Sequence, residues 1–145
     1  MCGVSATLEM KQILYVEDSG LSQHLMKRFV SGLGELSSCE NLTRAAAIFR
    51  ERTFDLLITD FRFRDGEAID LIQNIRQTLS PMQMPIIVVS SMMDNLLLNR
   101  VLRAGANEAF IKPLQMDYFR SVVTKMLEAP YVRRPEVVEV SAVCF

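Results

Sequence analysis

Five short apolar runs alternate with five longer stretches of helical periodicity along most of the chain. The apolar runs are residues 13–16, 36–39, 54–59, 86–89 and 109–111. In the stretches between and after them, apolar residues recur three or four positions apart, and three stretches follow a Ser, Asn or Asp that can cap a helix. Strict alternation of this kind is typical of a parallel sheet with helices on both faces. The sequence therefore predicts a three-layer α/β fold.

Length and charge limit the classes of protein to which this chain can belong. It has 145 residues, half of them hydrophobic, and a formal net charge of −1. A chain of roughly 100 to 200 residues forms one domain, and we expect that domain at residues 9–128 and a tail or linker stub at residues 129–145. The balanced charge argues against direct nucleic-acid binding. With neither an apolar run of about 20 residues nor a signal peptide, we expect a cytoplasmic protein that does not enter the membrane.

The cysteines and the histidine do not form a recognisable metal or catalytic pattern. Cys2, Cys39 and Cys144 are far apart in the sequence, which argues against a disulfide framework and against a zinc site. We expect Cys39 to be a small core residue. His24 is the only histidine, so a Ser-His-Asp triad is not expected, and its place in the first helical stretch predicts a surface or boundary position.

Polar residues follow four of the five apolar runs, at the point where each run stops. Glu17 and Asp18 follow the first run, Asp60 follows the third, Ser90 the fourth and Lys112 the fifth. All strands of a parallel sheet end on the same edge, and ligands bind outside that edge. A helix cap or a turn explains each residue taken singly, but not their joint placement. We therefore predict one site with three carboxylates, a hydroxyl and an ammonium group.

Three neighbouring carboxylates repel one another and raise each other's pKa unless a cation lies between them. An all-oxygen site suits Mg²⁺, which shares its coordination shell with phosphate oxygens. Such an ion neutralises charge on a phosphoryl group that arrives at Asp60, which makes this aspartate a reasonable nucleophile. Lys112 and Ser90 are then expected to contact phosphoryl oxygens, one as a point charge and the other through a hydrogen bond.

Over residues 11–127 the chain resembles the receiver domain of two-component response regulators. The matching features are the acidic pair followed by Ser19, Asp60 after Leu-Leu-Ile-Thr, Ser90 after the fourth run, Ala-Gly-Ala at residues 104–106, and Lys112-Pro113. The resemblance implies the flavodoxin-like (βα)5 fold, in which five parallel strands have the order 2-1-3-4-5. It also implies a cis Lys112-Pro113 bond.

The resemblance further implies a signalling function. In this family the aspartate matching Asp60 accepts a phosphoryl group from a phosphohistidine of a sensor histidine kinase or a histidine phosphotransfer domain. Mg²⁺ is bound by the residues matching Glu17, Asp18 and Asp60 and by the backbone carbonyl of the residue matching Arg62. Such a domain catalyses only its own phosphorylation and dephosphorylation, and we expect phosphorylation to shift the face formed by the fourth helix, fifth strand and fifth helix.

The sequence departs from the family in two places. In the loop after the third run, Arg64 and Ala68 replace the usual proline and glycine, so we expect Gly66 to supply a positive φ angle there. In the fifth run, Ala109 stands where many receivers carry a Tyr or Phe that moves inward on activation. Phe110 is expected in the core, because adjacent strand residues face opposite sides. These departures leave an alternative: a pseudo-receiver docking module that does not take phosphate.

Two further hypotheses concern other chemistry and association. A phosphatase of the haloacid dehalogenase type also uses a strand-end Asp and Mg²⁺. In such enzymes the nucleophile follows the first strand, and a second Asp stands two residues later. In this chain Asp60 follows the third run and Arg62 stands two residues later, which argues against this class.

Leu96, Leu97 and Leu98 cannot all be buried, since consecutive helical residues point about 100° apart. With Met92 and Met93 before them, they suggest a homodimer or effector face on the fourth helix, fifth strand and fifth helix.

Overall fold

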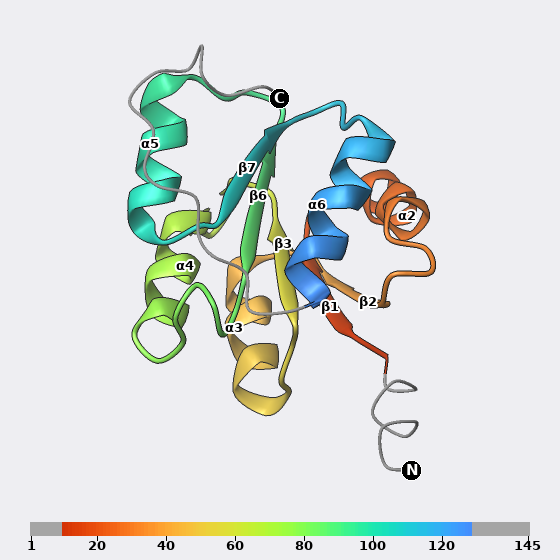
Figure 1. Ribbon diagram of the computed structural model, residues 1–145. Coiled ribbons are helices and arrows are strands. Elements are labelled where there is room, and N and C mark those ends of the chain that lie inside the picture. Colours follow the sequence, from red (N-terminus) through yellow and green to blue (C-terminus); the bar gives the residue numbers. More distant parts are fainter. Residues whose placement is uncertain (1–9, 129–145) are drawn as a thin grey trace.

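The computed structural model describes residues 10–128 and has a five-stranded parallel sheet at its centre. The strands are β1 (Gln12–Val16), β2 (Glu35–Cys39), β3 (Leu56–Thr59), β6 (Ile86–Ser90) and β7 (Glu108–Ile111). Their order across the sheet is β2-β1-β3-β6-β7, and each neighbouring pair is parallel. Counted as sheet strands along the chain, this is the order 2-1-3-4-5, so the predicted fold is confirmed (Figure 1).

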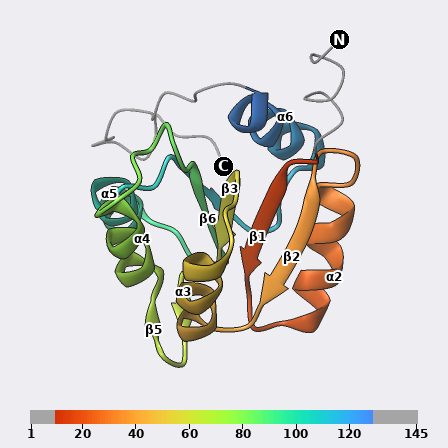
Figure 2. The same ribbon diagram turned by 90° about the horizontal axis from the view of Figure 1, so that it is seen from below.

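Helices cover both faces of the sheet, as the alternation predicts. They are α2 (Gly20–Phe29), α3 (Leu42–Glu51), α4 (Ala68–Arg76), α5 (Asn95–Ala104) and α6 (Met116–Glu128). Figures 1 and 2 show α3, α4 and α5 on one face and α2 and α6 on the other. The side chains of Ser19, Asn41 and Asp94 each accept a backbone N–H in the first turn of α2, α3 and α5. These caps satisfy backbone N–H groups at the start of the helices that follow β1, β2 and β6.

The sheet is buried on both faces, which explains why its central strands are almost entirely apolar. Alternating side chains of one strand enter two separate cores, so that Leu57 packs under α3, α4 and α5 while Ile58 packs under α2 and α6. Cys39 is buried and His24 is exposed, as predicted. None of the described helices combines the length and apolar character needed to cross a bilayer. Cys2, Cys144 and the predicted tail at residues 129–145 lie outside the described residues.

One predicted strand boundary needs correction, and one short element was not predicted. The third strand begins at Leu56, because the residue before it, Asp55, uses both its backbone N–H and its carboxylate to bind the backbone of Gln12. The chain after β3 also forms a short antiparallel hairpin, β4 (Arg62–Phe63) with β5 (Gly66–Glu67), which the sequence did not predict. Gly66 has φ +142°, so the expected positive φ in this loop is confirmed.

The Ala-Gly-Ala segment before β7 has a packing role and does not contribute to the polar site. Gly105 follows α5 with φ +125°, and a Cβ there would lie 2.6 Å from Cγ of Arg76. The Arg76 guanidinium donates to the carbonyl of Gly105 at 2.9 Å and to Oδ1 of the buried Asn107 at 3.0 Å. Only glycine fits such a position, because it combines positive φ with a close approach. The hydrogen bonds of Arg76 connect α4 to the start of β7, at the edge of the sheet opposite to the carboxyl ends of its strands.

Candidate functional site

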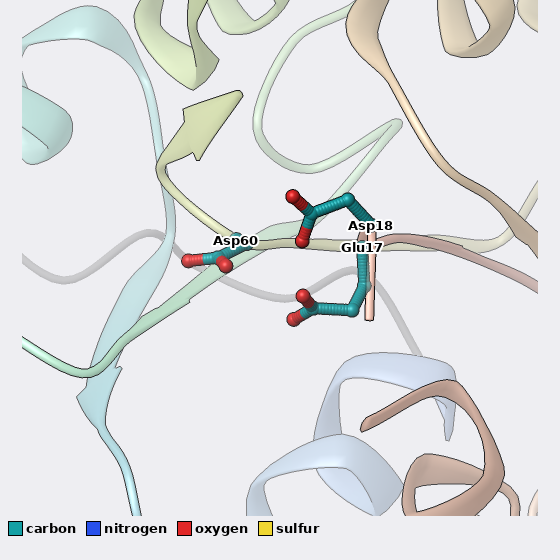
Figure 3. A group of neighbouring side chains, drawn as sticks. All are labelled: Glu17, Asp18 and Asp60. Atoms are coloured by element: carbon teal, nitrogen blue, oxygen red, sulfur yellow. The ribbon is translucent and has the colours of Figure 1, made fainter. Parts of the chain in front are cut away.

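β1 and β3 bring three carboxylates together at one edge of the sheet. Glu17 and Asp18 follow β1, Asp60 follows β3, and the two strands are neighbours. One oxygen from each side chain lies within 4.8 Å of the other two. Figure 3 shows the three side chains extending from these two strand ends around a common space. Glu17 is buried, Asp60 is half-buried and Asp18 is exposed, so the group is open to solvent on the Asp18 side.

Lys112 reaches this group from the end of β7. Its Nζ lies 2.8 Å from Oε1 of Glu17 and 3.7 Å from Oδ2 of Asp60. The residue is held in place by its backbone N–H, which donates to the carbonyl of Ser90 at 2.8 Å, and the Lys112-Pro113 bond is cis. The ammonium group therefore lies between two carboxylates and makes its shorter contact with Glu17.

Burial and neighbouring charges shift the pKa values of Glu17 and Asp60 in opposite directions. Burial favours the neutral form of Glu17, but the hydrogen bond and charge of Lys112, with the Ser19 N–H, hold its pKa below the usual range. The pKa of Asp60 is raised, first by burial and also by the charges of Glu17 and Asp18, despite the N–H of Phe61 and the charge of Lys112. The single ammonium group of Lys112 therefore does not offset the effects of burial and of the two acidic neighbours on Asp60. An all-oxygen group with this excess of negative charge fits a hard divalent cation such as Mg²⁺.

Ser90 ends β6 next to β3, but its hydroxyl is bound within its own loop. Oγ donates to the backbone carbonyl of Met92 at 3.0 Å and accepts the N–H of Met92 at 3.2 Å. Both contacts are short enough to be true hydrogen bonds. Ser90 thus has to leave the Met92 carbonyl before its hydroxyl can donate to another group.

The loop after Asp60 is fixed by charged contacts of its own. Arg62 is exposed, and its guanidinium lies 3.5 Å from Glu67 across the hairpin, while Arg100 of α5 lies 3.0 Å from the same carboxylate. Farther along, Asp65 accepts the N–H of Thr43 at 2.9 Å at the start of α3. The loop therefore keeps a defined path despite the missing proline. The Arg62 carbonyl as a metal ligand stays a prediction.

Ala109 and Phe110 lie on opposite faces of β7. Ala109 is buried in the core under α3, α4 and α5. Phe110 is buried on the other face, where its ring lies 5.3 Å from that of Phe119 and 5.8 Å from that of Tyr118. The expectation that Phe110 is a core residue is confirmed. It therefore does not occupy the position of the missing aromatic.

Sequence reasoning missed one residue that touches this group of side chains. The hydroxyl of Tyr15, in β1, donates to Oε1 of Glu17 at 3.0 Å, and the contact is buried. A signal was present in the sequence, because residues two apart on a strand face the same side. A tyrosine two positions before a buried glutamate is thus a candidate partner for it.

Comparisons with known proteins agree with the fold and with the predicted family. A family model described as "Response regulator receiver domain" matches residues 13–124. The response regulator protein PilR of Pseudomonas aeruginosa is 30% identical over 102 residues, which cover 70% of this chain and 22% of PilR. The chemotaxis protein CheY of the same organism is 24% identical over 119 residues, which cover 81% of this chain and 96% of CheY. This chain thus spans less than a quarter of PilR but nearly all of CheY.

Solved structures show the same fold. The crystal structure of a response regulator from Thermotoga maritima superposes with a TM-score of 0.73 at 22% identity, covering 83% of this chain and 100% of that one. A two-component response regulator from Clostridium difficile gives a TM-score of 0.74 at 20% identity, covering 81% and 95%.

Proposed function

Because the chain belongs to the response regulator receiver domain family, we propose that Asp60 accepts a phosphoryl group in two-component signal transduction. The donor is a phosphohistidine of a histidine kinase or of a histidine phosphotransfer domain. The observation that carries this proposal is the meeting of Asp60 with two further carboxylates and, at 3.7 Å, with the ammonium group of Lys112. In that arrangement, positive charge can offset the negative charge of the phosphoryl group while the carboxylate attacks phosphorus.

The contacts of Asp60 indicate which oxygen reacts. Oδ1 accepts the N–H of Phe61 at 2.7 Å, which orients the carboxylate and leaves Oδ2 on the Lys112 side. Oδ2 forms the new bond to phosphorus as the P–N bond of the phosphohistidine breaks, and the imidazole keeps the electron pair. Lys112 then stabilises charge on a phosphoryl oxygen, and Ser90 supplies a hydrogen bond once it has left Met92.

We propose Mg²⁺ as the cofactor of this reaction. Its ligands are Glu17, Asp18, Asp60 and the backbone carbonyl of Arg62, an all-oxygen set of the kind that this ion prefers. When bound, Mg²⁺ neutralises charge on the phosphoryl oxygens. The raised pKa of Asp60, caused by burial and by its acidic neighbours, supports the need for such a charge.

The test is intact mass spectrometry after incubation with acetyl phosphate and Mg²⁺ at neutral pH. We expect one phosphoryl group per chain, and we expect none when EDTA replaces Mg²⁺. A protein that stays unmodified with Mg²⁺ present is instead the docking module that takes no phosphate. Two observations favour that second function: Ala109 in place of an aromatic residue, and the engagement of the Ser90 hydroxyl by Met92.

We also propose that α5, β7 and α6 form a contact surface for a second copy of the chain. Leu98 is buried while Leu96 is 72% exposed, which confirms that the three consecutive leucines are not all buried. Met92 is 78% exposed, and it lines the same surface pocket as Leu96. Sedimentation equilibrium should show a dimer that strengthens with acetyl phosphate and Mg²⁺. A monomer at high concentration in both conditions contradicts the dimer.

A further inference from the structure

Tyr15 is a buried residue with a polar hydroxyl next to the site, and the proposed reaction does not use it. It is 1% exposed, and its ring packs in the core under α2 and α6. The hydroxyl donates to Oε1 of Glu17 at 3.0 Å. A phenol hydroxyl is protonated at neutral pH, so Tyr15 donates a hydrogen bond to the carboxylate.

The contacts of Glu17 show what this hydrogen bond does to the carboxylate. Oε1 accepts from Tyr15 and also from Lys112, at 2.8 Å, while among residues 10–128 Oε2 accepts a hydrogen bond only from the Ser19 N–H, at 3.2 Å. Each carboxylate oxygen has about two acceptor directions. Oε1 is therefore fully used by protein donors, and the remaining capacity of the carboxylate lies on Oε2.

Lys112 alone would hold this orientation less firmly. Its side chain is 25% exposed, and its ammonium group also lies near Asp60. In the proposed reaction Lys112 turns from Glu17 to the phosphoryl group, whereas the buried Tyr15 has no such second role. The tyrosine thus supplies the fixed hydrogen bond to Oε1.

We propose that Tyr15 is a positioning residue of the phosphoryl-transfer site: its hydroxyl fixes the Glu17 carboxylate with Oε1 toward Lys112 and keeps Oε2 for the metal ion. This inference rests on the proposed function, and in particular on Mg²⁺ binding. Residues that orient a metal ligand typically change metal affinity by 10- to 100-fold when they are replaced. We expect the lower end of that range, because Ser19 and Lys112 still hold Glu17.

The experiment measures Mg²⁺ binding directly, by following backbone amide NMR shifts during a titration of the unphosphorylated protein. Tyr15→Phe should raise the dissociation constant for Mg²⁺ about tenfold, and phosphorylation by acetyl phosphate should need correspondingly more Mg²⁺ but reach a similar rate at saturation. Tyr118→Phe is the matched control, because it removes a hydroxyl from an exposed ring of α6 and should leave the affinity unchanged. Thermal unfolding without Mg²⁺ verifies that each variant is folded.

A double-mutant cycle separates positioning from a general structural role. If Tyr15 acts through the carboxylate, Tyr15→Phe has no effect on Mg²⁺ affinity in a Glu17→Ala background. An equal loss of affinity in both backgrounds, or wild-type affinity in Tyr15→Phe alone, overturns the inference while the proposed function stands. Absence of Mg²⁺ binding by the wild-type protein overturns both.

Discussion

Asp60→Asn is expected to abolish the phosphoryl adduct that the wild-type protein forms with acetyl phosphate and Mg²⁺. The amide has no anionic oxygen to attack phosphorus, yet its carbonyl can still accept the Phe61 N–H that now binds Oδ1 at 2.7 Å. Intact mass spectrometry checks the result. Asp70→Asn, the same change on an exposed position of α4, should leave one phosphoryl group per chain. An adduct of wild-type level on Asp60→Asn would assign the modification to another residue.

The same substitution should make the metal-free protein more stable at neutral pH. Burial and the neighbouring carboxylates raise the pKa of Asp60 in the folded state. The charged form of Asp60 therefore lowers the free energy of unfolding. The cost is present above the folded-state pKa and disappears as the pH falls below the unfolded-state pKa. The gain in free energy of unfolding should therefore be clear at pH 7 and shrink in acid. Denaturant unfolding at several pH values measures this difference.

Lys112→Met is expected to lower both phosphorylation and stability. The variant loses the charge that stabilises phosphoryl oxygens, and it leaves Glu17, whose side chain is 3% exposed, without its cation. Breaking a fully buried pair costs about 3–5 kcal/mol. Because the Lys112 side chain is 25% exposed, we expect a smaller loss of free energy of unfolding, about 2 kcal/mol. Lys125→Met, on the exposed side of α6, should change stability by less than about 0.5 kcal/mol.

The pH dependence of this variant identifies the charge responsible. In the wild-type protein the pKa of Glu17 is lowered, so its ionisation stabilises the fold above its usual pKa, and this contribution is lost as the pH falls through the folded-state value. Without Lys112, burial dominates and raises that pKa, so the charged carboxylate costs stability at pH 7. The difference in free energy of unfolding between the variant and the wild type should therefore disappear in acid. Adding Glu17→Gln should recover much of the loss at pH 7; a loss unchanged by this second substitution rules out Glu17 as its cause.

Local patterns predicted the layers of the fold and the edge where polar residues gather, while the strand order was predicted from the family resemblance. The alternation of apolar runs and helical stretches predicted the layers, since a strand buried on both faces must be apolar throughout. The residues Glu17, Asp60 and Lys112 could be placed at one edge because parallel strands all end on the same side. The hairpin after β3 was missed, since two-residue strands leave no periodicity to detect.

The hydrogen bonds within the site were decided only by the tertiary structure. Lys112 makes its shorter contact with Glu17 rather than Asp60, and Ser90 binds Met92. The spacing of Tyr15 and Glu17 places both on one face of β1, but only the fold shows that the hydroxyl bonds Oε1 of the carboxylate. A pattern of residue types determines which face or edge a side chain occupies. Which atoms it bonds depends on rotamers and on distances of about 3 Å between strands far apart in the chain, and these exist only once the sheet has assembled.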